Sequence, residues 1–402
     1  MSRQRAHIAM IGIPAVSHTL PSLEIIRELV TRGHRVTYAN DKAVADLIIP
    51  TGAQLVPYRS TLPVSDNDWP HDPIAAMSLF LDDAIQMLPQ LRVVYADDPA
   101  DVYLYDIGGY AARALAEAQG APAVQLSPSY VAWASFEEEV GAQLRQLPGA
   151  DAYFERFTAW LAECGATTTD AESFGGRPRR AVAMIPRAMQ PHADTVDPRI
   201  VSFVGPCLDG PDGPDGSDGR ANQGTWTRPA DAENVLLISL GSAYTRQVEF
   251  YRRCLVAFGD LPGWHVVLQI GKYTDPAELG QIPDNIEVHA WVPQVAILRQ
   301  ADAFVTHAGM GGCSEGLHSG VPMIAVPQGA DQFGNADRLV ELGVARRIDT
   351  EDATADALRA ALLELTADQE VARRLVSLRD QARAEGGARR AADLIEAELS
   401  RG

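Results

Sequence analysis

The sequence predicts an α/β protein made of two Rossmann-like domains that face each other across a cleft. Three observations predict this fold class. Short apolar runs alternate with helical stretches from residue 7 to residue 126. The alternation restarts at Asn234, after a stretch rich in Gly, Pro and Asp. Strands joined through helices by short connections favour parallel sheets, whose ligands bind at the carboxyl ends of the strands.

The first half opens with a strand, a helix and a second strand. Residues 7–13 are continuously apolar, as in a strand covered on both faces. Leu23 begins an amphipathic helix that ends near Gly33, and residues 34–39 form the next strand. Further along, we expect a Pro-rich surface loop over 59–75, helices over 77–91 and 111–119, and strands over 102–105 and 123–126.

Residues 130–161 have a helical pattern that is unusually aromatic. Large aromatic side chains stabilise a fold chiefly by burial, so we expect most of them in the core. The remainder could line an apolar cleft. The seven aromatic residues are Tyr130, Trp133, Phe136, Tyr153, Phe154, Phe157 and Trp160.

The sharpest change in composition predicts the domain boundary. Residues 205–219 are so rich in Gly, Pro and Asp that they cannot form a packed element. We therefore expect a first domain over 1–204, a linker over 205–230 and a second domain over 231–402. The second half is expected to have strands at 234–240, 265–270, 286–289, 303–306 and 322–327. Its helical tail ends in a helix that could pack back on the first domain.

Composition excludes several classes of partner. The chain has 34 Lys+Arg against 53 Asp+Glu, a net charge of −19, which disfavours nucleic acid and anionic membranes. No apolar run approaches the roughly 20 residues that cross a bilayer, and no cleavable signal is evident. The 4 cysteines lack the spacing of a zinc site or disulfide framework, so a cytoplasmic protein is expected.

A phosphate site is predicted where the strand over 303–306 meets a Gly-rich turn and a helix beginning near Cys313. Unpaired N–H groups and the positive end of the helix dipole converge there. His307 can donate to a phosphate, and Glu315 can accept from ribose hydroxyls. The turn's glycines, which let the backbone approach a ligand, are Gly309, Gly311 and Gly312.

A reacting centre is predicted at His18 and Asp106. Each lies just after a strand of the first half, so both can reach the same edge of the sheet. A neutral imidazole can take a proton from an attacking hydroxyl, while a carboxylate orients it and stabilises the imidazolium. The Asp66-Asn67-Asp68 segment has the form of a metal motif but lies in a Pro-rich loop, so no metal is expected.

These blocks resemble the donor motif of inverting nucleotide-sugar glycosyltransferases. Trp291-Val-Pro-Gln294, the segment from His307 to Glu315, and Asp331-Gln332 occur in that family's order. Over nearly its whole length the chain resembles the macrolide glycosyltransferases of actinomycetes, the oleandomycin glycosyltransferase group. The resemblance implies the two-Rossmann GT-B fold.

The resemblance also implies roles for individual residues. Trp291 would stack on uracil, Val292 would bind it through its backbone, and Gln294 and Glu315 would hold the ribose. His307, with the amides near Gly312 and Cys313, would hold the pyrophosphate, and Asp331 and Gln332 would hold the hexose. The donor set also includes Ser242. Residues that could line the acceptor cleft are Met77, Phe80, Tyr130, Trp133 and Phe136.

The predicted reaction is inverting transfer of glucose from UDP-glucose, as co-substrate, to a hydroxyl of a macrolide or similar apolar molecule. No cofactor is expected to be required, and a monomer or weak homodimer is expected. Two alternatives stay open: transfer from a TDP-deoxysugar in antibiotic biosynthesis, and a nucleotide-sugar epimerase. A non-catalytic helper is disfavoured because His18 and Asp106 are both present.

Four positions depart from the family pattern, and one is Leu20, which stands before Pro21 where the related enzymes usually have Asn. Val16 and Ser17 stand where the related enzymes usually have His and Gly, which makes the loop before His18 stiffer and more apolar. Cys313 stands where Ser or Thr is common. These departures leave the identity of the acceptor open.

Overall fold

The computed structural model describes residues 5–64, 68–70, 72–208 and 224–400. The chain divides into two compact units, and each is built from separated segments. The first unit comprises Met1–Met184, Gln190–Gly219 and Gly386–Gly402. The second unit comprises Ile185–Met189 and Arg220–Glu385.

The first unit contains a seven-stranded parallel sheet with the strand order β3-β2-β1-β4-β5-β6-β7. Because the order reverses between β1 and β4, their carboxyl ends lie side by side at the edge where α/β proteins bind ligands. The strands are β1 (His7–Ile11), β2 (Arg35–Asn40), β3 (Gln54–Pro57), β4 (Val102–Asp106), β5 (Ala123–Ser127), β6 (Ala181–Ala183) and β7 (Val201–Phe203).

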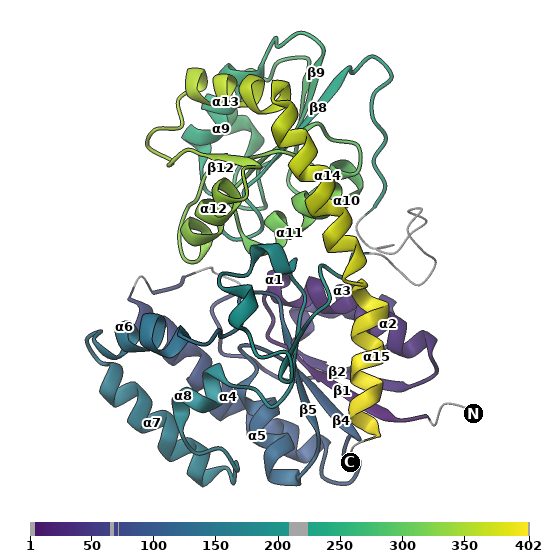
Figure 1. Ribbon diagram of the computed structural model, residues 1–402, viewed down its shortest axis with the longest axis vertical. Coiled ribbons are helices and arrows are strands. Elements are labelled where there is room, and N and C mark those ends of the chain that lie inside the picture. The colour runs from purple at the N-terminus through teal and green to yellow at the C-terminus, as the bar shows by residue number, and fades with distance from the viewer. Residues whose placement is uncertain (1–4, 65–67, 71, 209–223, 401–402) are drawn as a thin grey trace. The chain divides into compact units, whose positions relative to one another are not determined.

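Helices cover both faces of this sheet. The helices are α1 (Val16–Thr19), α2 (Leu23–Thr31), α3 (Ala45–Ile48), α4 (Pro73–Val94), α5 (Tyr110–Gln119), α6 (Ala142–Arg145), α7 (Ala150–Glu163), α8 (Ala171–Gly176) and α15 (Gly387–Leu399). Helices α4, α5, α7 and α8 share one core cluster. Helices α2 and α15 share the cluster on the opposite face (Figure 1).

The C-terminal helix α15 is part of the first unit. Ala391 and Ile395 are fully buried in the same cluster as the apolar face of α2. At the edge of this contact, Nη1 of Arg32 donates to Asp393 at 2.7 Å and to Glu396 at 2.9 Å. The last helix of the chain therefore helps α2 to cover one face of the first sheet.

The second unit contains a six-stranded parallel sheet with the order β10-β9-β8-β11-β12-β13. Its strands are β8 (Asn234–Ser239), β9 (Trp264–Gln269), β10 (Ile286–His289), β11 (Ala303–Thr306), β12 (Met323–Ala325) and β13 (Ala345–Arg347). Its helices are α9 (Val248–Phe258), α10 (Gln294–Leu298), α11 (Met310–Ser319), α12 (Gln332–Glu341), α13 (Ala355–Ala367) and α14 (Gln369–Ala384). The prediction of two parallel-sheet, Rossmann-like domains is confirmed.

The local predictions need two corrections. The helix predicted over 77–91 is α4, which begins earlier because the Asp72 side chain caps the amide of Ala75 and Pro73 suits a first turn. The helix predicted to begin at Tyr130 does not form before Glu137. The amide of Val131 bonds instead to Oε1 of Gln190, and regular structure resumes with a π-helical turn at Glu137–Gly141.

Most of the predicted linker, 209–223, lies outside the described residues. At its flanks, Cys207 and Leu208 are buried, and Nε1 of Trp226 donates to Glu287 at 2.8 Å. Within the described part of the chain, no helix is long and apolar enough to cross a membrane.

Candidate functional site

His18 and Asp106 meet at the carboxyl end of the first sheet. His18 Nδ1 lies 3.0 Å from Oδ1 and 2.9 Å from Oδ2 of Asp106. The Asp106 side chain is 2% exposed, whereas His18 is 26% exposed. The carboxylate is thus enclosed, and the imidazole reaches the surface of the site.

The local sequence explains this geometry. Asp106 is the last residue of β4, next to the end of β1, and His18 lies on α1, which follows β1. The amide of Gly108 donates to Oδ1 of Asp106 at 2.8 Å. A Cβ at Gly109 would lie 3.2 Å from the carbonyl oxygen of Ile11, so a side chain there would push the turn away from β1.

This pair has the arrangement of a general base and its orienting carboxylate. A buried carboxylate that accepts from Nδ1 favours the tautomer with the proton on that nitrogen. Nε2 then carries the lone pair that can accept a proton. The same carboxylate would stabilise the imidazolium that forms.

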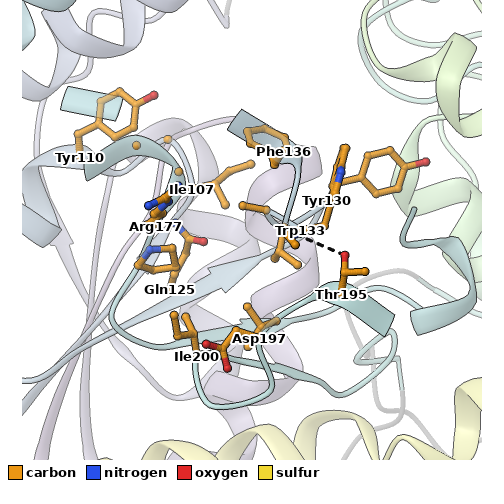
Figure 2. A pocket seen from close by; sticks show the side chains of 18 of the residues that line it. Ile107, Tyr110, Gln125, Tyr130, Trp133, Phe136, Arg177, Thr195, Asp197 and Ile200 are labelled. Atoms are coloured by element: carbon orange, nitrogen blue, oxygen red, sulfur yellow. Dashed lines mark hydrogen bonds between the residues drawn. The ribbon is translucent and has the colours of Figure 1, made fainter. Parts of the chain in front are cut away.

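A pocket of about 470 Å³ opens beside His18 within the first unit (Figure 2). It brings His18 together with all five residues predicted to line an acceptor cleft, which are Met77, Phe80, Tyr130, Trp133 and Phe136. Trp133 and Phe136 form an edge-to-face pair with ring centroids 4.9 Å apart. By contrast, Tyr153, Phe157 and Trp160 are buried in the core. The aromatic segment therefore divides between pocket wall and core, as predicted.

In the second unit, the predicted phosphate site is a turn packed around His307. A Cβ at Gly241 would lie 2.8 Å from Nε2 of His307, and one at Gly309 would lie 2.9 Å from its Cε1. Both positions therefore need glycine. Ala308, between His307 and Gly309, adopts a left-handed φ of 60°. Such strain at a turn is often found at ligand sites.

Helix α11 begins at this turn, with Gly309 as its N-cap residue. Gly311 is exposed and would have nothing within 4 Å of an added Cβ. The amide of Cys313 donates to the carbonyl of Gly309 at 3.0 Å and so belongs to the helix. The amides with no partner inside the helix are therefore those of the first turn, Met310–Gly312.

The Cys313 thiol is fully buried, and burial raises its pKa well above the usual range. It is unsuited to act as a nucleophile. His307 is affected in the opposite direction: desolvation lowers the pKa of its imidazole to about 4. The imidazole is therefore neutral at physiological pH and can serve as a hydrogen-bonding group rather than a cation.

The predicted ribose residues are in contact with each other. Nε2 of Gln294 donates to Oε2 of Glu315 at 2.6 Å. Beside them, the amide of Val292 donates to Oε1 of Gln269 at 3.1 Å. Trp291 is 48% exposed, unusual for so large an apolar side chain. It thus offers a flat face for a nucleobase.

The two predicted hexose residues differ in their surroundings. Asp331 is exposed, and its Oδ2 accepts from Asn335 at 2.9 Å. Gln332 is only 3% exposed, and its Oε1 accepts from the amides of Gln328 at 2.7 Å and Gly329 at 3.1 Å. Gln332 therefore braces the loop, and Asp331 is the more available of the two. Ser242 lies exposed in the loop after β8.

Sequence reasoning missed Gln269 in this second site. Gln269 joins the Trp291 segment to the loop after β8, because its Nε2 donates to the carbonyl of Gly241 at 3.0 Å. A polar residue at the end of an apolar strand was the available signal. Asn335, which ends the stretch that the sequence singles out as the donor site, donates through Nδ2 to the Ala308 carbonyl at 3.0 Å.

The residues that the structure describes contain no group of three or more His, Cys, Asp or Glu side chains that could hold a metal ion. In the predicted Asp-x-Asp segment, Asp66 and Asn67 lie outside the described residues.

Comparisons with known proteins show which proteins this chain is similar to. Residues 254–397 match the family model of the erythromycin biosynthesis protein CIII-like C-terminal domain. The chain is 56% identical over 401 residues to oleandomycin glycosyltransferase of Streptomyces antibioticus, covering 98% of this chain and 91% of that protein. It is 35% identical over 405 residues to the NDP-glycosyltransferase YjiC of Bacillus licheniformis, covering 98% of both chains.

A solved structure is also similar to this chain in fold and sequence. The crystal structure of the glycotransferase of kitacinnamycin matches with a TM-score of 0.89 and 52% identity. The match covers 99% of this chain and 100% of that one. The similarity therefore includes both sheets and both candidate sites.

Proposed function

Because the chain belongs to the macrolide glycosyltransferases, enzymes of the GT-B fold, we propose that it transfers glucose from UDP-glucose to a hydroxyl of a macrolide or similarly large apolar natural product. The single observation that best supports this proposal is the His18–Asp106 pair in the wall of a largely apolar pocket. A base directed at an apolar cavity suits an acceptor that is mostly hydrocarbon and reacts through one hydroxyl.

In the proposed mechanism, His18 takes the acceptor proton at Nε2 as the hydroxyl oxygen attacks the anomeric carbon. The bond from that carbon to the diphosphate breaks, and the diphosphate leaves with the electron pair. Asp106 stabilises the imidazolium through Nδ1. Attack from the side opposite the leaving group inverts the anomeric carbon.

The donor would be held by the second unit. Trp291 would stack on uracil, with the Val292 backbone beside it, and Gln294 and Glu315 would bind the ribose. The first-turn amides of α11 and the neutral His307 would bind the diphosphate. A helix N-terminus already supplies positive potential, so the proposal includes no metal.

Glucose is proposed over a 2,6-dideoxyhexose because of Asp331. Its carboxylate is exposed and can accept from sugar hydroxyls. A sugar without those hydroxyls would leave part of the accepting capacity of the carboxylate unused in the complex, because Asn335 fills only some of it, and this costs affinity. We therefore expect Asp331→Ala to reduce turnover with UDP-glucose far more than it weakens binding of UDP. Equal losses for both would mean that Asp331 supports the fold.

The decisive experiment incubates the protein with UDP-glucose, or with a TDP-linked deoxysugar, and a panel of macrolides, flavonoids and phenols. Products are read by mass. A gain of one hexosyl unit on an acceptor, larger with UDP-glucose, is the expected result. Preferential use of the deoxysugar donor would overturn the donor assignment. Conversion of the sugar nucleotide without acceptor would indicate an epimerase instead.

A further inference from the structure

Gln125 is a buried polar residue in the wall of the pocket, and the mechanism does not use it. The side chain is 7% exposed and lies among the residues that line the pocket (Figure 2). Its backbone amide donates to the carbonyl of Arg180 at 2.9 Å within the sheet. Its carboxamide makes no hydrogen bond with any residue that the structure describes.

Two other buried glutamines, Gln190 and Gln269, have carboxamides that are bonded within the protein. Gln190 uses both ends of its carboxamide on the backbone of Val131. Gln269 accepts from Val292 and donates to Gly241. Gln125 differs from these two because its carboxamide lines the pocket and is not bonded to any described residue, which leaves it available to a ligand.

The sheet explains why this side chain faces the pocket. Its neighbours Val124 and Leu126 point into the core beneath α2 and α15, so Gln125 points to the opposite face. On that face it pairs in register with Tyr105 on one side and Ala181 on the other. The small side chain of Ala181 leaves space beside the carboxamide.

Two charged side chains of the pocket already have partners. Arg177 forms an ion pair with Glu137. Asp197 accepts from the guanidinium of Arg199, with Nη2 at 2.7 Å, and from the Arg199 amide at 2.9 Å. A charged group on the acceptor would have to compete with these pairs. The carboxamide, which has both a donor and an acceptor, suits a neutral group.

We propose that Gln125 is a specificity-determining residue for the acceptor, binding a neutral hydroxyl or carbonyl group distinct from the hydroxyl that reacts at His18. The inference rests on the proposed function. The acceptor is then an apolar body with two polar points: one loses its proton to His18, and the other satisfies the Gln125 carboxamide. An acceptor without the second group leaves the carboxamide unpaired and binds more weakly.

The test compares wild-type protein with Gln125→Met, an apolar replacement of similar length. The acceptors are 2-naphthol, which has one hydroxyl, and dihydroxynaphthalenes, which have two. With UDP-glucose as donor, we expect Gln125→Met to lower kcat/KM for at least one dihydroxynaphthalene by roughly 10- to 100-fold, the usual loss for a buried hydrogen bond. Transfer to 2-naphthol should be unchanged or faster. Calorimetric binding of the same acceptors without donor should follow the same order.

A matched control is Gln119→Met. Gln119 accepts from the hydroxyl of Tyr103 at 2.6 Å and donates to the Tyr95 carbonyl at 3.2 Å, and it does not line the pocket. This control should lower the melting temperature and keep the acceptor preference. Gln125→Met should instead keep or raise the melting temperature and change the preference.

The outcomes separate the two proposals. If wild-type protein glucosylates neither acceptor class nor any macrolide, the proposed function fails. If wild-type protein glucosylates these acceptors and Gln125→Met retains the same ratio of kcat/KM values, the role of Gln125 is overturned. A loss of melting temperature in Gln125→Met equal to that of Gln119→Met would also overturn it, because the carboxamide would then be structural.

Discussion

At the scale of single residues, the proposed proton transfer is divided between His18, which is partly exposed, and Asp106, which is enclosed. If His18 removes the acceptor proton, His18→Ala should lower transfer to an aliphatic alcohol by roughly 10²–10⁴-fold. A phenol or thiol that is already ionised at the assay pH should lose much less. Asp106→Asn should show a smaller loss in the same direction, because the imidazole remains but is poorly oriented. Rates measured across acceptors of decreasing pKa provide the check.

Two controls accompany this prediction. Binding of UDP should be nearly unchanged in His18→Ala, since the residues proposed to bind the donor belong to the second unit. His289→Ala removes an exposed imidazole that contacts Glu287 and should leave transfer intact. Wild-type transfer to an aliphatic alcohol by His18→Ala would exclude His18 as the base. A uniform loss across alcohols and phenols would point to acceptor positioning.

His307 leads to a prediction about pH. Burial lowers its pKa to about 4, so the imidazole is neutral throughout the range from pH 8 to pH 6. UDP-glucose is a diphosphate diester, whose charge is constant over the same range. Its dissociation constant, measured by calorimetry, should therefore stay flat between these pH values. A tightening that follows an ordinary histidine pKa near 6.5 would contradict a neutral His307.

At the scale of elements, two glycines at the start of α11, Gly309 and Gly311, are expected to have different roles. Gly309 makes room for a protein group, His307, whereas Gly311 has open space around it. We expect Gly311→Ala to keep or raise the melting temperature, since alanine favours a helix, and yet to weaken UDP-glucose binding by blocking the diphosphate. Gly309→Ala should lower both stability and binding.

Gly334→Ala is the control for this pair. Gly334 lies in α12 of the same unit and also has nothing near an added Cβ. The Gly334→Ala variant should have a higher melting temperature than the wild type and unchanged donor binding. If Gly311→Ala binds UDP-glucose as tightly as Gly334→Ala does, the diphosphate does not approach that turn.

The elements also show how far the sequence could predict the structure. Long apolar strands and the turn from β11 into α11 were predictable, because apolar periodicity and glycine act locally. Strands β6 and β7, three residues each, are too short to carry such a pattern. Residues from Tyr130 to Phe136 have a helical pattern, but they form a loop in which the carboxamide of Gln190, far along the chain, bonds to both the amide and the carbonyl of Val131.

The candidate sites were predictable to a similar extent. His18 and Asp106 could be named because each follows a strand, and Tyr130, Trp133 and Phe136 because they belong to an aromatic segment. Met77 and Phe80, on the helix over 77–91, were named together with the family resemblance. Gln125 could not, because a glutamine inside an apolar strand has the same sequence context whether its carboxamide is bonded or not. Only the register with Tyr105 and Ala181 reveals its surroundings.

At the scale of the whole molecule, the first unit depends on the last helix. Ile395 is fully buried between α15 and the sheet face that α2 also covers. Ile395→Ala should destabilise this unit by about 2–5 kcal/mol, the usual cost of a buried Ile-to-Ala change. Hydrogen exchange should rise in α2 and β1, but not in the helices of the second unit.

Leu363→Ala is the matched change in the second unit, where Leu363 is 47% exposed. It should leave exchange in both units close to that of the wild type. If Ile395→Ala speeds exchange equally in both units, the chain unfolds as one cooperative body. If it speeds exchange in neither, α15 contributes little to the first unit.

Each unit is built from segments that are separated in the sequence, and this matters for enzyme engineering. A recombinant hybrid that joins the acceptor half of one relative to the donor half of another is most easily cut once, between residues 208 and 224. With a single junction there, Gly386–Gly402 would come from a different parent than the rest of the first unit. Ile185–Met189 would likewise come from a different parent than the rest of the second unit. Hybrids that also restore these two short segments to their original partners should express and fold better than single-junction hybrids of the same parents.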